Sequence, residues 1–528
     1  MPLLKGAASD FTAFVKAAAF LPGARSTGNS GTAPPMGVLS SVVTASTVAR
    51  ASVKKPTTTT TTSNAAATSV YLPVTSLFGG YIVKYDTYGV VKWCTTMLGT
   101  GSGGASGFAA IAIDSTGIYA SGYYGADSVV TLNNGVTLPI SVGVDVFIVK
   151  YNTSGVPQWA TTIAGTGTDK PYSIATDSTG VYITGTYQST SVVTLNNGKT
   201  LPITSSKDAF IVKYDTSGVA QWATTIAEAP AVNDGFGFGI AVDSTGVYVT
   251  GWCRASNVNT ANNGITFTSA LGIGSGIFNV KYDTTSGLAQ WATLFSTAAS
   301  GGSVGGFTGG CATDSTGVYI AASYQSTSVV TLNNGKTLPI SVGQDVFIVK
   351  YDTSGLVQWA TTISGTGTDR GLSIATDSTG VYVTGGYQST SVVTLNNGKT
   401  LPISVGLDVF IVKYDTSGVA QWATTIAGTG SDAGAAITTD STGVYVTGYY
   451  TSTSVVTLNN GKTLPISTNG ASGYDAFNVK YDRSGLAQWA ATIPTGVSQG
   501  TGINTDSTGV YAVGLYKSPS QVLPTNAS

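Results

Sequence analysis

Histidine is absent from this 528-residue sequence, and cysteine occurs only three times. The absence of histidine removes the commonest general base and the commonest metal ligand. Cys94, Cys253 and Cys311 are odd in number and share no register in the repeats described below. They therefore predict buried or half-buried free thiols rather than a disulfide framework.

Charged residues are also scarce. They make up 9% of the sequence, and the formal net charge is −1, which provides neither the basic surface that nucleic acid requires nor an acidic tail. Mean hydropathy is +0.20, yet no uninterrupted apolar run approaches the ~20 residues that span a bilayer. We expect no nucleic-acid partner and no membrane span.

What the sequence does contain is a long repeat. The tetrad Asp-Ser-Thr-Gly recurs with a tryptophan at a common period of about 63 to 71 residues, which indicates one supersecondary unit copied seven times. The tetrads begin at Asp114, Asp177, Asp243, Asp314, Asp377, Asp440 and Asp506. The tryptophans are Trp93, Trp159, Trp222, Trp291, Trp359, Trp422 and Trp489.

Each complete unit contains four short runs rich in Val, Ile, Thr, Tyr and Trp. In the fifth complete unit they are residues 373–376, 380–387, 408–414 and 421–427, and their composition is typical of strands. The first two runs are joined by DSTG and the last two by DTSG, both of them short turns in which Asp and Ser bond the backbone and Gly takes a positive φ. Four antiparallel strands per unit predict an all-β propeller.

The two ends of the repeat region are incomplete in complementary ways. The first unit has only a third strand, 81–85, and a fourth strand around Trp93, whereas the last unit has only the first two strands, within 503–516. Together they complete one blade. The sequence thus predicts a seven-bladed β-propeller over residues 70–528, with one blade shared between the N- and C-terminal segments.

The motifs DSTGVYVTG at Asp377 and KYDTSGVAQW at Lys413 resemble those of the SBBP-type β-propeller repeats. Units of that family carry an Asp-x-x-Gly turn, a Val-Tyr-Val-Thr-Gly strand and a Lys-Tyr-Asp-x-x-Gly-x-x-x-Trp strand pair. The resemblance covers roughly residues 70 to 528. It implies the propeller fold and a place among surface, secreted and large-virus proteins.

Residues 1–69 precede the repeats and form a separate arm. SDFTAFVKAAAFLPG, from Ser9, predicts a short amphipathic helix with the apolar anchors Phe11, Phe14 and Val15, and a Thr-, Ser-, Gly- and Pro-rich tether follows it. Asp10 and Lys16 interrupt the apolar core that a cleavable signal peptide needs. The helix either lies on its own propeller or docks on a neighbouring subunit and controls assembly.

The repeated Asp and Trp residues are interpreted structurally. Seven equivalent aspartates suit turns rather than one catalytic or calcium site. A tryptophan in every blade suits packing between blades rather than a cofactor platform. We therefore expect no metal or cofactor.

Two kinds of connection are the candidate binding elements. Between the second and third strands, SVVTLNNGKTLPI predicts a ribbon with a type I′ Asn-Gly turn that projects from each blade. The links from a fourth strand to the next unit differ most between units, and loops on a rigid scaffold commonly carry binding. Their polar residues, the candidates for the binding face, are Asp169, Lys170, Asp234, Asp369, Arg370 and Asp432.

These observations favour a non-enzymatic structural or adhesive surface protein, such as a virion, extracellular-filament or cell-coat component. Its expected partners are other protein subunits, copies of itself included, and the second option is glycans. A carbohydrate-binding propeller would use the repeated Tyr of GYQ with Gln188, Gln325 and Gln388. An enzyme with its site on a propeller face is the third alternative, although no differentiated base, nucleophile or metal cluster supports it.

Overall fold

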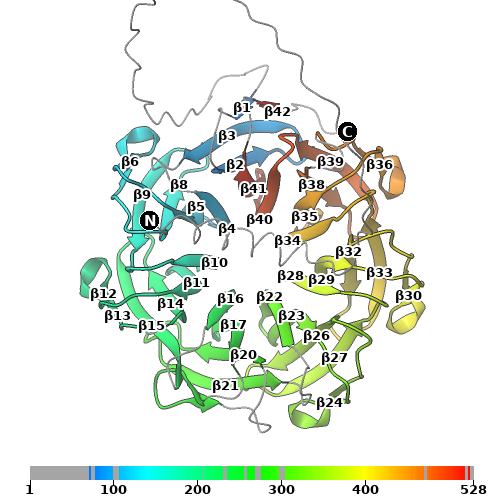
Figure 1. Ribbon diagram of the computed structural model, residues 1–528, viewed down its shortest axis with the longest axis horizontal. Coiled ribbons are helices and arrows are strands. Elements are labelled where there is room, and N and C mark those ends of the chain that lie inside the picture. The colour runs from blue at the N-terminus through cyan, green and yellow to red at the C-terminus, as the bar shows by residue number, and fades with distance from the viewer. Residues whose placement is uncertain are drawn as a thin grey trace, which may run out of the picture. The chain divides into compact units, whose positions relative to one another are not determined.

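The computed structural model describes residues 70–72, 78–98, 106–204, 206–229, 235–254, 258–267, 275–296, 304–468, 473–517 and 521–523. The arm of residues 1–69, with Phe11, Phe14 and Val15, lies outside the described residues, as does Asp234. The described part of the repeat region is an all-β ring of seven four-stranded antiparallel blades (Figure 1). This confirms the fold predicted from the repeats.

Six blades are continuous in sequence and run from an inner to an outer strand. Blade 1 consists of β4 (Gly107–Asp114), β5 (Gly117–Tyr124), β8 (Asp145–Tyr151) and β9 (Pro157–Ile163). Blade 2 consists of β10 (Lys170–Asp177), β11 (Gly180–Tyr187), β14 (Asp208–Tyr214) and β15 (Ala220–Ala229). Blade 3 consists of β16 (Phe236–Asp243), β17 (Gly246–Arg254), β20 (Ser275–Tyr282) and β21 (Ala289–Ser296). Blade 4 consists of β22 (Val304–Asp314), β23 (Gly317–Tyr324), β26 (Asp345–Asp352) and β27 (Val357–Ile363). Blade 5 consists of β28 (Arg370–Asp377), β29 (Gly380–Tyr387), β32 (Asp408–Tyr414) and β33 (Ala420–Ile426). Blade 6 consists of β34 (Ala433–Asp440), β35 (Gly443–Tyr450), β38 (Asp475–Tyr481) and β39 (Ala487–Ile493).

The seventh blade is assembled from both ends of the repeat region, as predicted. Its strand order is β40 (Ser498–Asp506), β41 (Gly509–Tyr516), β2 (Gly79–Tyr85) and β3 (Val91–Leu98), and Figure 1 shows the blue β2 and β3 beside the red β40 and β41. Tyr81 of β2 lies opposite Gly514 of β41. The ribbon of this blade is split in the same way, because β1 (Val70–Leu72) pairs with β42 (Gln521–Leu523). Closure of the ring therefore depends on strands from the two ends.

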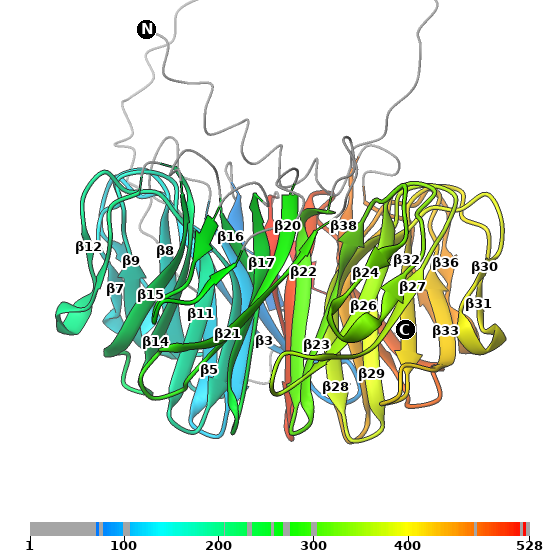
Figure 2. The ribbon, with the colours of Figure 1, turned by 90° about the horizontal axis from the view of Figure 1, so that it is seen from below.

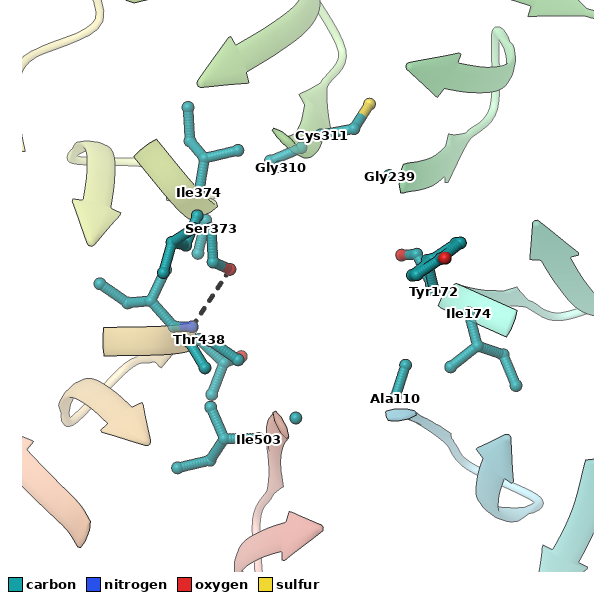
Figure 3. A pocket seen from close by; sticks show the side chains of 18 of the residues that line it. Ala110, Tyr172, Ile174, Gly239, Gly310, Cys311, Ser373, Ile374, Thr438 and Ile503 are labelled. Carbon is teal, nitrogen blue, oxygen red and sulfur yellow. Dashed lines mark hydrogen bonds between the residues drawn. The ribbon is translucent and has the colours of Figure 1, made fainter. Parts of the chain in front are cut away.

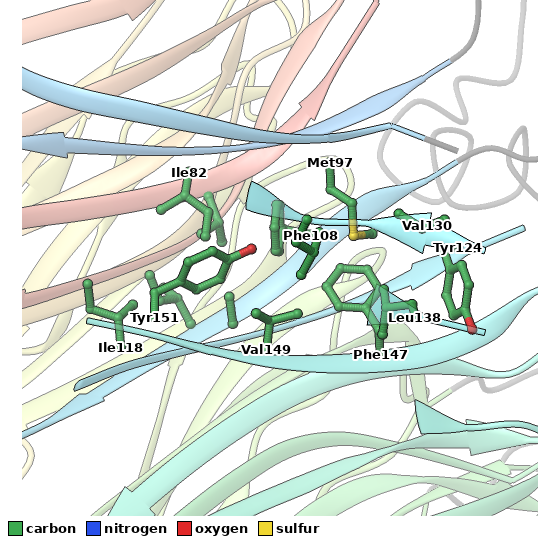
Figure 4. Packing of buried hydrophobic residues seen from close by; sticks show 14 of the residues in the cluster. Ile82, Met97, Phe108, Ile118, Tyr124, Val130, Leu138, Phe147, Val149 and Tyr151 are labelled. Carbon is green, nitrogen blue, oxygen red and sulfur yellow. The ribbon is translucent and has the colours of Figure 1, made fainter. Parts of the chain in front are cut away.

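The third strand of each blade is buried on both of its faces. In β8, DVFIVKY, every residue is buried, because a neighbouring blade packs against each face of the sheet. Such a strand carries a continuous apolar run instead of an alternating one. Figure 4 shows one of the resulting clusters, in which Ile82 and Met97 of blade 7 pack against Phe108, Phe147 and Val149 of blade 1. The hydrophobic core is therefore distributed between blades.

Each outer-strand tryptophan also connects its blade to the next one. The Trp359 indole N–H donates a hydrogen bond of 3.0 Å to the carbonyl of Thr416, in the turn that precedes the outer strand of blade 5. The glycine of that turn, Gly418, lies so close that a Cβ would be 2.7 Å from the Trp359 ring. The other six tryptophans make the same hydrogen bond, from the indole N–H to a backbone carbonyl of the next blade. The pairs, with the tryptophan first, are Trp93 and Thr153, Trp159 and Thr216, Trp222 and Thr284, Trp291 and Thr353, Trp422 and Arg483, and Trp489 and Thr87.

The ring has two different faces (Figure 2). On one, which we call the turn face, the DSTG and DTSG turns lie together. In the turn after β10, the Asp177 carboxylate accepts hydrogen bonds from the backbone of Thr179 and Gly180 and from the Tyr182 hydroxyl. The opposite face, the loop face, carries the links between the second and third strands and those between blades.

The ribbons predicted between the second and third strands are present, but they do not project. Asn196 of the ribbon in blade 2 donates to the Gly218 carbonyl and accepts from the Ala220 N–H, both at 2.7 Å, so the ribbon lies along the outer strand. Asn197 and Gly198 have the predicted positive φ values of 62° and 71°, although the turn is a three-residue loop, Asn196–Gly198, closed by a hydrogen bond from the Leu195 N–H to the Lys199 carbonyl, and not a two-residue type I′ turn. The turn residues could be predicted from the sequence, but the hydrogen bonds from Asn196 to the start of the outer strand could not.

The ribbon elements form the outer edge of the ring in Figure 1. They are β6 (Val130–Thr131), η1 (Asn133–Gly135) and β7 (Thr137–Leu138); β12 (Val193–Thr194), η2 (Asn196–Gly198) and β13 (Thr200–Leu201); β18 (Val258–Thr260) and β19 (Thr266–Phe267); β24 (Val330–Thr331), η3 (Asn333–Gly335) and β25 (Thr337–Leu338); β30 (Val393–Thr394), η4 (Asn396–Gly398) and β31 (Thr400–Leu401); and β36 (Val456–Thr457), η5 (Asn459–Gly461) and β37 (Thr463–Leu464).

Candidate functional site

Three of the candidate aspartates on the loop face are buried. Asp169, Asp369 and Asp432 each follow the link that leads out of an outer strand, and each has no exposed surface. The Asp169 carboxylate accepts hydrogen bonds from the backbone N–H of Gly165, at 2.5 Å, and of Gln188, at 2.8 Å. It therefore fixes the link against the end of β11 and does not face a partner.

The same arrangement recurs in two further blades. Asp369 accepts from the backbone of Gly365 and of Gln388, and Asp432 accepts from Gly428 and Thr451. The sequence correctly placed these residues in the links, but the repeat pattern did not reveal that the links fold inward over the carboxylates.

A second set of aspartates, which the sequence reasoning missed, lies beside the first. Asp145, Asp345 and Asp408 begin β8, β26 and β32 and are almost fully buried. Burial, followed by the charge of Asp169, raises the pKa of Asp145 to about 7, while burial raises the pKa of Asp169 itself to about 6. The signal in the sequence was the Asp of DVFIVKY, which recurs in the same units as the Asp of the link.

Each of the two candidate cations interacts with a tyrosine of a neighbouring blade. The ammonium of Lys170 in blade 2 lies 5.3 Å from the centre of the Tyr123 ring in blade 1. Arg370 of blade 5 has its Nε and Nη1 atoms buried without a hydrogen-bond partner. Burial lowers the pKa of its guanidinium, and Tyr449 of blade 6 opposes that shift. The structure therefore does not bring the five described candidates together into one site, and Asp234 lies outside the described residues.

A cavity of about 300 Å³ occupies the centre of the ring and is lined by the inner strands of all seven blades (Figure 3). The strands approach closely at small residues: a Cβ on Gly239 would lie 2.9 Å from the Cβ of Cys311. The Ser373 hydroxyl accepts a hydrogen bond of 3.2 Å from the Ile437 N–H. None of the lining side chains is charged, and burial raises the pKa of the Cys311 thiol. The cavity thus offers no acid–base pair and no activated nucleophile.

The tyrosines expected to form a sugar platform are unavailable for that role. Tyr187 and Tyr387 are fully buried, and their hydroxyls donate to the carbonyls of Pro202 and Pro402 at 3.0 Å. They hold the ribbons to the second strands. The basis on which the sequence suggested carbohydrate binding is therefore lost at these positions.

The outer edge of the ring exposes the same two aliphatic side chains on five ribbons. Each pair consists of the Val before the first ribbon strand and the Ile after the second, and each side chain is 53% to 61% exposed. We call these ten residues the rim pairs. They are Val129 and Ile140, Val192 and Ile203, Val329 and Ile340, Val392 and Ile403, and Val455 and Ile466.

The described part of the chain lacks two kinds of feature. No group of three or more Asp, Glu or Cys side chains that could hold a metal ion occurs there. Within the same ranges, no helix is long and apolar enough to cross a membrane.

Fold and site geometry together define a seven-bladed β-propeller with an uncharged central cavity and a repeated apolar rim. No protein-family model matches the chain, so the resemblance to the SBBP-type repeats stays a prediction. The chain is 27% identical over 444 residues to an uncharacterised WD repeat-containing protein, L264, of Acanthamoeba polyphaga mimivirus. That alignment covers 70% of this chain but only 31% of the mimivirus protein, so the chain spans about a third of its relative's length.

Two solved structures can be superposed on this chain. A protein of unknown function from Dyadobacter fermentans aligns with a TM-score of 0.37 and 8% identity, over 83% of this chain and 99% of that one. Quinohemoprotein alcohol dehydrogenase from Comamonas testosteroni aligns with a TM-score of 0.33 and 11% identity, over 79% of this chain and 75% of that one.

Proposed function

We propose that this protein is a non-enzymatic interaction scaffold that serves as a structural or adhesive component of an outer surface, such as a virion, an extracellular filament or a cell coat. The observation that carries the proposal is the set of rim pairs. Five ribbons present the same exposed valine and isoleucine at the edge of one rigid ring.

A repeated apolar edge suits protein partners better than a small ligand. Single exposed aliphatic residues are ordinary, but the same pair at five places offers several identical contacts to one partner or to several copies of it. Exposed lysines on three of these ribbons, Lys199, Lys336 and Lys399, surround the apolar contact with a polar border, as in typical protein interfaces.

The mimivirus relative supports the kind of protein and the setting. It is described as containing WD repeats and it comes from a large virus, which agrees with an interaction propeller and with the virion among the proposed locations. The arm of residues 1–69, with its predicted anchors Phe11, Phe14 and Val15, is proposed as the element that joins one subunit to the next.

The experiment compares variants of the full chain by sedimentation. Replacing the five rim isoleucines with serine should reduce association while the melting temperature stays near that of the parent, because the side chains are exposed. The matched control replaces five exposed threonines of the same ribbons with serine: Thr131, Thr194, Thr331, Thr394 and Thr457. Deletion of residues 1–69 tests the arm separately. A parent protein that is monomeric at all concentrations, and binds no surface of its source, would contradict the proposal.

A further inference from the structure

Two buried aspartates meet in the same way at three places on the loop face. One member of each pair begins a third strand, and the other ends the link to the next blade. The backbone N–H of the second member donates to the residue that precedes the first: Asp169 to Val144 at 2.8 Å, for example. All six carboxylate residues are at most 2% exposed. The pairs are Asp145 with Asp169, Asp345 with Asp369, and Asp408 with Asp432.

One oxygen of each pair has no hydrogen-bond donor. The Oδ1 atoms of Asp145, Asp345 and Asp408 are buried and receive no hydrogen bond. Among the described residues, none of the six aspartates forms a salt bridge, since the two salt bridges there are those of Asp86 and Asp377. A buried carboxylate without a counter-charge or a full set of donors is costly, so something beyond these side chains should balance the pair.

Blade 6 provides an internal comparison. Asp475 begins its third strand at the same position, but the link that follows, residues 494–497, contains no aspartate. Here both carboxylate oxygens are satisfied, one by the backbone and hydroxyl of Thr468 and the other by the Gly496 N–H. A lone aspartate at this position is therefore completed by protein donors, whereas a paired one is not.

The two aspartates are also absent together. Gly276 in blade 3 and Gly79 in blade 7 take the place of the strand aspartate, and the links that follow, 297–303 and 99–105, contain no aspartate either. Both aspartates occur in blades 1, 4 and 5 and neither in blades 3 and 7, while blade 6 has the strand aspartate alone. Blade 2 has Asp208 at the strand position, and Asp234 of the link that follows lies outside the described residues.

A carbonyl oxygen lies next to each pair. A Cβ on Gly165 would be 2.6 Å from Asp169 Oδ2 and 2.8 Å from the Gln188 carbonyl. The corresponding glycines, Gly365 and Gly428, lie equally close to a carboxylate and a carbonyl oxygen. Carboxylates with backbone carbonyls form the donor set that Ca²⁺ prefers, because this cation takes six to eight hard oxygen ligands in a flexible geometry.

We propose that the three aspartate pairs are Ca²⁺ sites that fasten each link of the loop face to the third strand beside it. A divalent cation would neutralise both carboxylates and occupy the oxygen that no protein donor reaches.

The test uses the full-length protein and Tb³⁺, a Ca²⁺ substitute whose luminescence is excited by nearby tyrosines. Tyr387 is electrostatically coupled to both Asp369 and Asp408, so it is a suitable sensitiser. Bound Tb³⁺ should be displaced by Ca²⁺. The Asp145→Asn, Asp345→Asn and Asp408→Asn variants should each lose one equivalent, whereas the matched Asp475→Asn variant should lose none.

A second measurement, the melting temperature of the unmodified protein with and without calcium, does not depend on the folding of any variant. Calcium should raise the melting temperature of the unmodified protein above its value in EDTA at pH 7.5, since a ligand that binds only the folded state stabilises it. Absence of both Tb³⁺ binding and a calcium-dependent shift would overturn the proposal, as would equal losses in the Asp475→Asn variant. A melting temperature that rises as the pH falls from about 8 to about 5 and is unaffected by calcium would show that each pair holds a shared proton instead, and would also overturn it.

Discussion

The residues that hold the ring together are a tryptophan and a glycine in each junction between blades. The indole N–H needs a carbonyl of the next blade as its acceptor, and the indole ring needs the space that a Cβ on the glycine would fill. Both requirements recur at the junctions around the propeller, and this recurrence explains why Trp and Gly repeat in the sequence with the period of one blade. The tryptophans could be assigned to packing from the sequence alone, since a residue needed in every blade has no single site to serve.

Substitution of the junction glycine should be more damaging than its backbone conformation explains. Gly418 has φ +84° and faces Trp359, whereas Gly398 has φ +70° and open space around its Cα. We expect Gly398→Ala to cost about 1 kcal/mol for the left-handed backbone, and Gly418→Ala to cost about 1 to 3 kcal/mol more because the ring must move. Urea unfolding of both variants measures the difference. Equal losses of free energy would show that the Trp contact is not a close one.

One turn aspartate differs from its six equivalents. Asp377 accepts a hydrogen bond of 2.7 Å from Arg483, which replaces the threonine found at that place in blades 4 and 5. We expect Asp377→Asn to lower the free energy of unfolding by about 0.5 to 1 kcal/mol more than Asp177→Asn, since the ion pair is partly exposed.

A double-mutant cycle with Arg483→Thr checks the origin of that difference. The excess cost of Asp377→Asn should disappear when Arg483 is already replaced. An excess that persists in the Arg483→Thr background would assign it to the turn itself.

Among the elements, the strands were the most predictable and the links the least. Strand 380–387 was predicted as β29 with the same bounds, because its apolar run repeats in each unit, and the shared blade followed from two incomplete units. The ribbons were expected to project because their turn residues resemble those of a free hairpin. What the sequence did not state is that Asn196 reaches the start of the outer strand, a contact between residues 22 to 24 positions apart.

The burial of the link aspartates escaped prediction for a similar reason. Asp169 is surrounded by Gly and Thr in the sequence, which is typical of a solvated loop. In the structure, the same glycines let the backbone fold over the carboxylate and donate to it. Local composition cannot distinguish a loop that exposes a charge from one that encloses it.

Removal of the closing strands should break the ring. Deletion of residues 502–528 removes β41 and most of β40, so β2 and the inner strands of two neighbouring blades lose their partners, and exposed strand edges favour aggregation. We expect loss of a single cooperative melting transition. Deletion of residues 518–528 is the control, since it removes only β42 of the split ribbon. A monomeric 502–528 deletion with the melting temperature of the parent would contradict the shared blade.

For the molecule as a whole, acid should be the most effective denaturant because its turn carboxylates depend on being ionised. Burial alone would raise the pKa of Asp440, but the hydrogen bonds from Thr442 and Tyr445 outweigh it and hold the pKa below its usual value. Asp506 behaves in the same way through Thr508 and Tyr511. A folded-state pKa below the unfolded value contributes stability that is present above the unfolded pKa and is lost as the pH falls through the folded one.

We therefore expect the melting temperature to drop steeply below about pH 4, the unfolded pKa of aspartate. Calorimetry from pH 4.5 to 2.5 measures the slope, and the Asp506→Asn variant should show a shallower one because one titrating group is removed. A melting temperature that is constant or rises over this range would contradict the role of the turn carboxylates.

The shared blade also determines the order of events while the chain is being made. β2 begins at Gly79 and its partner β41 begins at Gly509, so at about 5 to 20 residues per second the ribosome delivers the partner roughly 20 to 90 s later. Throughout that interval the nascent chain carries an apolar strand with one open edge, while the similar second strands of six blades emerge in turn. Each is a competitor for β2, and a premature pairing would close a smaller ring. Correct synthesis therefore requires that each competitor be captured by its own blade faster than β2 can find it, which favours rapid local pairing over long-range search.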